Sequence, residues 1–211
     1  MARKPAEQSV SREEIIQAAA DVLSQKGYET TTMKDIAAEV DLTAASLYHH
    51  FKNKNALLLA VLEVGMDVAL SRIRPVAESD EPNREKLRQM IHVHVVSLAE
   101  HTAVGAAMVF EIGALLDVKP STGRTQLENS DSSRQRLFFE RRDAFEENFR
   151  QVVAAGVASG EFRQVDVPIF VKTMLGAHNW VSVWYRPGGR LEGQDIAEQM
   201  ADTFLRALQP D

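Results

Sequence analysis

The sequence has no cysteine among its 211 residues and no excess of positive charge. Without cysteine the chain has no disulfide, no thiolate zinc site and no thiol nucleophile. Its 24 Lys and Arg are outnumbered by 30 Asp and Glu, which gives a net charge of −6. This charge argues against a protein that coats nucleic acid without specificity and against a polybasic membrane binder, but it leaves a local basic face open.

Long apolar runs are also missing. No stretch approaches the roughly 18 residues that span a bilayer, and residues 1–10 (MARKPAEQSV) contain no apolar segment of the kind found in secretory signals. A hydrophobic content of 45% with 26% charged residues is typical of a packed globular chain. We therefore expect a cytoplasmic protein with no membrane partner.

The spacing of apolar residues predicts an all-α fold of about nine helices. A period near 3.6 recurs along the chain, and no strand-like alternation appears. Ser11 and Glu14 form the pattern of a capping box, and Pro75 is expected to end the fourth helix. The predicted helices cover residues 11–27, 32–40, 43–49, 54–74, 83–101, 103–116, 131–159, 167–185 and 191–208, with loops at 117–130 and 186–190.

Two short predicted helices joined by a tight turn near Asp41 have the layout of a helix-turn-helix. The second one has apolar anchors at Leu47 and Phe51, four residues apart, and small or hydroxyl side chains elsewhere. A helix that reads a major groove needs this division, because one face must pack on its own domain while the other enters the groove.

Residues 31–57 (TTMKDIAAEVDLTAASLYHHFKNKNAL) closely resemble the DNA-binding signature of the TetR/AcrR family of transcriptional regulators. The resemblance implies an N-terminal three-helix helix-turn-helix domain, here residues 1–54, and a C-terminal helical ligand-binding and dimerisation bundle, here residues 55–211. Two positions depart from the family pattern: Asp41 replaces a common glycine, and Val40 replaces a common alanine. Aspartate tolerates a left-handed backbone better than most residues, so we expect the turn to form.

The expected partner of residues 1–54 is palindromic, double-stranded operator DNA bound by a homodimer. This segment has seven Lys or Arg against eight acids, so binding must depend on where the basic side chains lie. We expect contacts from a basic arm, from phosphate-binding side chains and from the outer face of the second helix. These candidates are Arg3, Lys4, Thr32, Lys34, Thr43, Ala44, Ala45, Ser46, Tyr48, His49, Lys52 and Lys54.

The last two predicted helices carry apolar residues at helical spacing and are the expected dimer surface. Two such helices from each subunit would form a four-helix interface with two-fold symmetry. It would place the reading helices about 34–36 Å apart, or somewhat further on a longer operator. The main candidates are Phe170, Met174, Ala177, Val181, Met200 and Phe204.

Polar and aromatic residues within the C-terminal helices are candidates for contacts with a small-molecule effector. Glu111 interrupts an apolar helix, where it would either form an internal salt bridge to an arginine or meet a ligand. The segment 134–150 mixes arginines with phenylalanines. Either the arginines form a solvated face over a phenylalanine core, or the segment is a pocket wall whose arginines hold an anion. Residues 175–191 resemble a TetR branch whose members often sense acyl-CoA thioesters, although its tryptophans could equally serve packing. The candidates are His101, Met108, Glu111, Arg141, Phe145, Asn148, His178, Trp180 and Trp184.

The sequence therefore predicts a ligand-responsive transcriptional regulator. More specifically, we expect a repressor that is released from its operator by a small hydrophobic acidic effector such as an acyl-CoA. The sequence predicts no cofactor and no metal, since His92 and His94 are two residues apart and point in different directions on a helix. One alternative is a dimeric DNA-binding protein without an effector. The other is a helical enzyme that uses Glu111 with one of these histidines or His101 as acid and base.

Overall fold

The computed structural model describes residues 10–112 and 126–210, and within these ranges the chain is helical with no strand. The predicted all-α fold is confirmed. The helices are α1 (Arg12–Lys26), α2 (Met33–Glu39), α3 (Ala44–His50), α4 (Lys54–Ala77), α5 (Asn83–Glu100), α6 (Thr102–Phe110), α8 (Gln126–Ser159), α9 (Val167–Trp184) and α10 (Gly193–Ala207).

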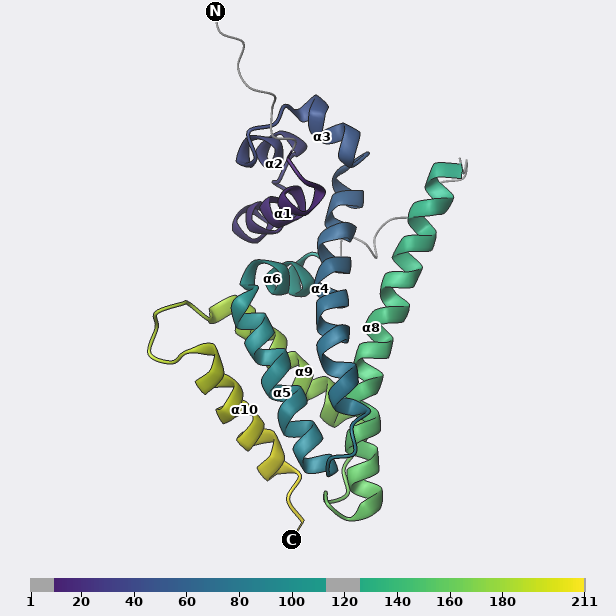
Figure 1. Cartoon of the computed structure of the whole chain (residues 1–211), viewed down its shortest axis with the longest axis vertical. Coiled ribbons are helices and arrows are strands. Elements are labelled where there is room, and N and C mark those ends of the chain that lie inside the picture. The colour runs from purple at the N-terminus through teal and green to yellow at the C-terminus, as the bar shows by residue number, and fades with distance from the viewer. Residues whose placement is uncertain (1–9, 113–125, 211) are drawn as a thin grey trace, which may run out of the picture.

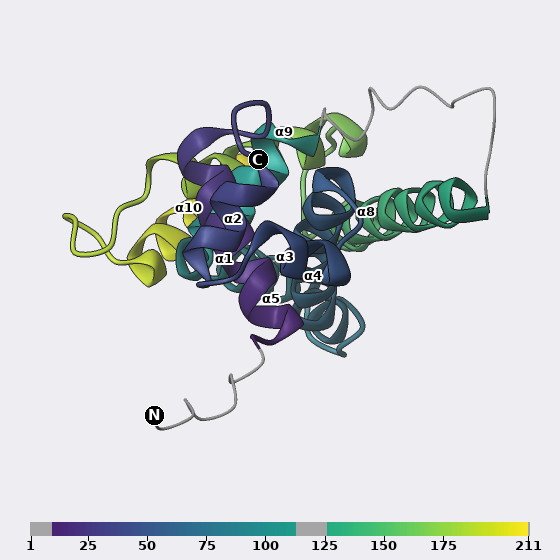
Figure 2. The same cartoon turned by 90° about the horizontal axis from the view of Figure 1, so that it is seen from above.

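Helices α1 to α3 form a small unit at one end of the molecule, and α4 runs from this unit down into a bundle made with α5, α6, α8, α9 and α10 (Figure 1). Seen from above, the three short helices cover the end of the bundle, while α8 reaches out to one side (Figure 2). One continuous apolar core joins the two parts, from Ile15 on α1 to Leu205 on α10. The two parts are thus packed together through one core.

Each of the first four helices begins after a residue whose side chain caps it. Ser11 and Glu14 form the predicted capping box, with the Glu14 amide donating to Ser11 Oγ at 3.1 Å. Thr32 caps α2 in the same way with Asp35, and Thr43 and Asn53 cap α3 and α4. Each cap satisfies an amide that the first turn of a helix leaves unpaired.

Two predicted helix ends are wrong. Pro75 lies inside the last turn of α4, which continues to Ala77, because a proline so close to the end removes only one backbone hydrogen bond and the Glu78 amide still donates to Arg74 at 3.0 Å. Residues 126–130 begin α8 although their polar composition predicted a loop, since polar composition also suits the solvated end of a long helix. Helix α6 ends at Phe110, and the rest of the helix predicted to residue 116 falls largely outside the described residues.

Within the described residues, no single helix has both the length and the apolar composition to cross a membrane. Helices α5 and α6 meet these criteria only as a pair, and they are bent by 99° relative to each other.

Candidate DNA-binding surface and effector pocket

Helices α2 and α3 form a helix-turn-helix with the predicted turn. Asp41 adopts a left-handed backbone with φ of 53°, the only positive φ of a non-glycine residue in the described ranges. The amide of Leu42 donates to the Ala37 carbonyl at 2.8 Å and closes the turn. Leu47 and Phe51 are buried, so the two predicted anchors hold α3 against the rest of the unit.

The opposite face of α3 is open to solvent. Thr43, Ala45, Tyr48 and His49 are exposed on it, while Ala44 and Ser46 are half-buried. Tyr48 keeps 53% of its surface exposed, so this side chain is accessible to a partner from solvent. Lys34 and Lys52 are exposed on the neighbouring elements, and Arg3 and Lys4 lie outside the described residues.

Two of the expected phosphate contacts have partners inside the chain. The Lys54 ammonium donates to the carbonyls of Tyr28 at 2.5 Å and Thr31 at 2.9 Å, and it lies 4.0 Å from the centre of the Tyr28 ring. The Thr32 hydroxyl donates to Asp35 at 2.6 Å. Lys54 therefore ties the connection between α1 and α2 to the start of α4, and its contact with phosphate stays a prediction.

Asp35 is also held by a cation within the unit. The Lys26 ammonium donates to Asp35 at 2.8 Å, and this hydrogen bond, with those from Thr32, holds the pKa of the Asp35 carboxyl well below its ordinary value. These contacts fix the start of α2 relative to the end of α1. They also neutralise an acid that would otherwise repel a phosphate backbone.

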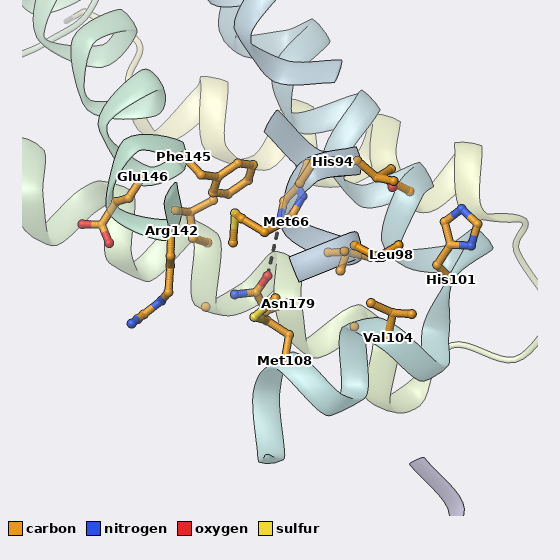
Figure 3. Close-up of a pocket in the computed structure, with 18 of the residues that line it drawn as sticks. Met66, His94, Leu98, His101, Val104, Met108, Arg142, Phe145, Glu146 and Asn179 are labelled. Atoms are coloured by element: carbon orange, nitrogen blue, oxygen red, sulfur yellow. Dashed lines mark hydrogen bonds between the residues drawn. The ribbon is translucent and has the colours of Figure 1, made fainter. Parts of the chain in front are cut away.

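A cavity of about 460 Å³ lies between α4, α5, α6, α8 and α9 in the bundle. Its wall is mostly apolar, with side chains from all five helices (Figure 3). Gln17 on α1 also lines it, so the cavity extends to the unit that carries the helix-turn-helix. The apolar members of the wall are Val64, Met66, Val68, Ala69, Leu98, Val104, Met108, Phe145 and Leu175.

Charged side chains line the cavity at one end. Arg142 and Glu146 on α8 lie at this end, opposite His101 (Figure 3), and Lys172 on α9 donates to Glu146 at 3.1 Å. Burial alone would raise the pKa of Glu146, but the hydrogen bonds and charges of Lys172 and Arg150 outweigh burial and lower it. Glu146 is thus an anion shared by two cations, while Arg142 is exposed and has no ion-pair or hydrogen-bond partner among the described residues.

Polar side chains also interrupt the apolar wall deeper in the bundle. His94 on α5 and Asn179 on α9 form a hydrogen bond of 3.3 Å between Nε2 and Oδ1. Burial lowers the pKa of His94 to about 4, so this imidazole is neutral at neutral pH. His178 lies behind it with ring centroids 5.6 Å apart, and burial together with the nearby His94 places its pKa well below the ordinary value.

Two family models match this architecture. Residues 15–61 match the model described as bacterial regulatory proteins, tetR family, and residues 80–208 match the tetracyclin repressor-like C-terminal domain. The chain belongs to the TetR family. It is therefore a DNA-binding transcriptional regulator, and α2 and α3 are its helix-turn-helix.

Individual TetR-family proteins are similar over nearly the whole chain. The transcriptional repressor KstR2 of Mycolicibacterium smegmatis is 26% identical over 206 residues, which cover 97% of this chain and 93% of that protein. The crystal structure of PfmR from Thermus thermophilus superposes with a TM-score of 0.76 at 28% identity and covers 93% and 99% of the two chains. AibR, solved with isovaleryl coenzyme A and operator DNA, shares the fold with a TM-score of 0.73 at 24% identity, with 94% and 98% covered.

Three of the effector contacts predicted for this TetR-family chain line the cavity: His101, Met108 and Phe145. Six do not. Glu111 closes the C-terminus of α6 and faces the end of α1, with its Oε1 within 3.7 Å of the position that a Cβ on Gly27 would take. It has no salt bridge to an arginine among the described residues and does not line the cavity, so its contact with an effector stays a prediction.

The other five candidates lie outside this cavity because their side chains point in other directions. On α8, Arg141 pairs with Asp67 of α4 at 2.8 Å, and the Asn148 amide donates to its own helix at Ala144. His178 is buried behind His94, and Trp180 and Trp184 line a separate hollow of about 680 Å³ between α9 and α10. Arg142 and Asn179 also line the cavity; they lie within the segments 134–150 and 175–191 that sequence reasoning considered, although neither was named as a candidate contact, and Lys172 was not considered at all.

The expected dimer surface of this TetR-family chain needs a similar correction. Met174 and Val181 are fully buried within the chain, so they cannot meet a second subunit. The apolar side chains that α9 exposes are Ile169, Trp180 and Trp184, which fall on one face together with Ala177. Phe170, Met200 and Phe204 are half-buried, and Phe170 packs edge to face on Phe204 with centroids 6.0 Å apart.

Proposed function

We propose that this protein is a homodimeric repressor that leaves a palindromic operator when an acidic amphipathic molecule, best represented by an acyl-CoA thioester, enters the cavity. Residues 1–54 would bind DNA, and residues 55–211 would bind the effector and the second subunit. The protein acts in the cytoplasm by binding alone and has no catalytic step. The observation that carries the proposal is an apolar cavity whose charged end offers Arg142 and Lys172.

The cavity has the chemistry that such an effector needs. An apolar acyl chain is stabilised by leaving water for a wall of aliphatic and aromatic side chains. Phosphates or a carboxylate outside the apolar part would then meet Arg142, whose guanidinium has no partner among the described residues, and the ammonium of Lys172. Cations would be repelled at the same place.

The known relatives are consistent with this proposal. KstR2 is a repressor, and AibR, which shares the fold, binds isovaleryl coenzyme A as well as operator DNA. A cavity of about 460 Å³ also argues against the alternative of a DNA-binding protein that has no effector, because that alternative requires no such space.

The proposed mechanism is a shift between two conformations of the dimer. The cavity reaches Gln17 on α1, and α1 packs against both α4 and α6. An effector that fits better when α1 and α6 move relative to α4 would favour a dimer whose two reading helices no longer match successive major grooves. Effector binding would then weaken DNA binding, and DNA binding would weaken effector binding by the same factor.

The test begins with an operator obtained by selection from a randomised duplex pool. Release of this labelled duplex is followed by fluorescence anisotropy during titration with acyl-CoAs of increasing length, the corresponding free acids, and a cationic aromatic dye. We expect release by acyl-CoAs at the lowest concentrations and none by the dye. Release by the dye alone, or by none of the acidic compounds, would overturn the proposal.

Two neighbouring arginines provide a matched comparison. Arg142→Gln removes the unpaired cation at the cavity, whereas Arg141→Gln removes a cation of the same helix that pairs with Asp67 outside it. Because charge-assisted hydrogen bonds contribute about 1.5–3 kcal/mol, Arg142→Gln should weaken acyl-CoA binding roughly 10-fold to 100-fold. Arg141→Gln should leave acyl-CoA binding unchanged. Equal effects of the two variants would contradict the assignment of Arg142 to the charged end of the cavity.

A further inference from the structure

The wall of the cavity contains a group of polar side chains that a plain hydrocarbon chain would leave without partners. We call it the inner polar cluster, and it consists of His94 and Ser97 on α5 and His178 and Asn179 on α9. His94, Ser97 and Asn179 line the cavity directly, and His178 stands behind His94. The cluster lies among apolar residues, and the His94 ring packs against Phe145 with ring centroids 5.0 Å apart.

The cluster makes few hydrogen bonds for its number of donors and acceptors. Among the described residues its side chains make one hydrogen bond with each other, the bond of 3.3 Å from His94 to Asn179, and the Ser97 hydroxyl has no partner. His178 is completely buried, and neither of its ring nitrogens has a partner there. Buried polar atoms without partners are rare, because each loses its hydration without compensation.

The orientation of Asn179 leaves its donor for the cavity. Its oxygen is turned toward His94, as the dashed line shows in Figure 3, and its amide nitrogen has no partner among the described residues. Ser97, which also lines the cavity, adds a hydroxyl that donates or accepts. A ligand oxygen near Asn179 would accept a hydrogen bond from its amide nitrogen.

The electrostatics of the cluster favour an uncharged oxygen. Both imidazoles are buried and neutral, so neither supplies a positive charge for a carboxylate or a phosphate. The cations that line the cavity, Arg142 and Lys172, are on the solvent-exposed end described above. An anion bound at the cluster would be desolvated without a counter-charge.

We propose that the apolar part of the effector carries a neutral oxygen, a ketone or a hydroxyl, which accepts a hydrogen bond from Asn179 Nδ2 inside the cavity. This inference rests on the proposed function, since it concerns the same cavity and names the class of molecule that fits it. The preferred effectors are oxygenated acyl or ring compounds, and saturated hydrocarbon chains of the same size bind more weakly. Asn179 is thus the residue that sets specificity between these classes.

The experiment measures binding to the purified full-length protein by calorimetry, using pairs of ligands that differ only in the oxygen. One pair is octanoyl-CoA and 7-oxooctanoyl-CoA, and another is the CoA thioesters of cyclohexanecarboxylic acid and 4-oxocyclohexanecarboxylic acid. A third pair, without CoA, is tert-butylcyclohexane and 4-tert-butylcyclohexanone. Because a hydrocarbon leaves the buried donor unpaired whereas a ligand oxygen pairs with it, the oxygenated member should bind about tenfold more tightly in at least one pair.

Two variants assign that preference to the cluster. Asn179→Leu keeps the size of the side chain and removes its donor, so it should abolish or reverse the preference. Asn148→Leu makes the same replacement on α8, at a residue that does not line the cavity and whose amide donates to its own helix, and should retain the preference. If Asn179→Leu does not fold, the preference for the oxygenated ligand is still measured with Ser97→Ala and with the unmodified protein.

The outcomes separate this inference from the proposed function. Equal affinity within all three pairs, or a preference that survives in Asn179→Leu, overturns the inference while acyl-CoA recognition stands. If the acyl-CoAs fail to bind but the free ketone binds more tightly than its hydrocarbon, the proposed acyl-CoA function is wrong and the neutral-oxygen site is supported. Failure of the ketone together with both oxygenated thioesters overturns the inference as well.

Discussion

Lys54 offers a sharp test of whether a basic residue near the helix-turn-helix binds DNA or supports the fold. Its ammonium donates to two backbone carbonyls at 2.5 and 2.9 Å, weakly to a third at Glu29 at 3.4 Å, and lies over the Tyr28 ring. The substitution Lys54→Met keeps most of the aliphatic stem and removes only the charge and its hydrogen bonds. We expect the fold to be weakened and the direct contacts with phosphate to be unchanged.

The expected magnitude follows from these contacts. Two hydrogen bonds from a charged donor contribute about 1.5 kcal/mol each at the low end of their range, and the cation over an aromatic ring adds about 0.5–1 kcal/mol. Against this, a positive charge in the first turn of α4 opposes the helix dipole by about 0.3–1 kcal/mol, which its removal relieves. The net loss is about 2.5–3.7 kcal/mol, which lowers Tm by about 5–15 °C in a chain of this size.

Two assays distinguish the roles. Thermal unfolding measures the loss of stability, and the dependence of DNA affinity on salt counts phosphate contacts, because each contact contributes about 0.9 to the slope of log K against log salt. Lys34→Met is the matched control, since Lys34 is exposed on α2 and has no hydrogen-bond or ion-pair partner among the described residues. If Lys34 contacts phosphate, its loss in both subunits should reduce the slope by about 1.8 and leave Tm unchanged.

The reasoning about Lys54 would be refuted by the converse result. A Lys54→Met protein with unchanged Tm and a slope reduced by about 1.8 would show that the ammonium leaves its carbonyls for phosphate when DNA is present. A lower Tm with an unchanged slope supports the structural role, even if the affinity falls because the unit is less rigid.

Three further predictions concern the bundle. First, the buried His94 should lower stability by about 2 kcal/mol between pH 7.5 and 5, because its pKa is lowered to about 4 and the unfolded chain takes up the proton first; the buried His178, whose pKa is also lowered, adds a loss of the same sign. Urea unfolding at the two pH values checks this, and His178→Leu should flatten the dependence, whereas an unchanged dependence would contradict the burial argument. Second, Gly65→Ala would place a Cβ 2.5 Å from Val104 of α6, so the melting temperature should drop with a loss of about 1–3 kcal/mol, while Gly176→Ala, which meets nothing within 4 Å, should not be destabilised. Equal melting temperatures for the two glycine variants would show that α4 and α6 separate freely. Third, Trp184→Glu should convert the dimer to monomers in sedimentation experiments, because it puts a charge on the exposed apolar face of α9, whereas Leu137→Glu on α8 should leave the dimer intact. A Trp184→Glu protein that remains dimeric would place the interface elsewhere.

The DNA-binding unit could be predicted from the sequence in detail because its determinants are local. A cap such as Ser11 with Glu14 involves residues three apart, and the left-handed turn at Asp41 depends on the residue itself and on its immediate neighbours. The anchors Leu47 and Phe51 share a face because they are one helical turn apart. The same periodicity correctly predicted the helical fold of the described residues.

The tertiary structure alone decided which face of each long helix meets the cavity, the core or solvent. Arg141 and Arg142 are adjacent in the sequence, yet a rotation of about 100° per residue sends one to Asp67 and the other to the cavity. In the same way, Met174 and Trp180 belong to one apolar helix, but one is buried and the other exposed. Helical spacing states which side chains point the same way, and only the packing of distant helices states what they point toward.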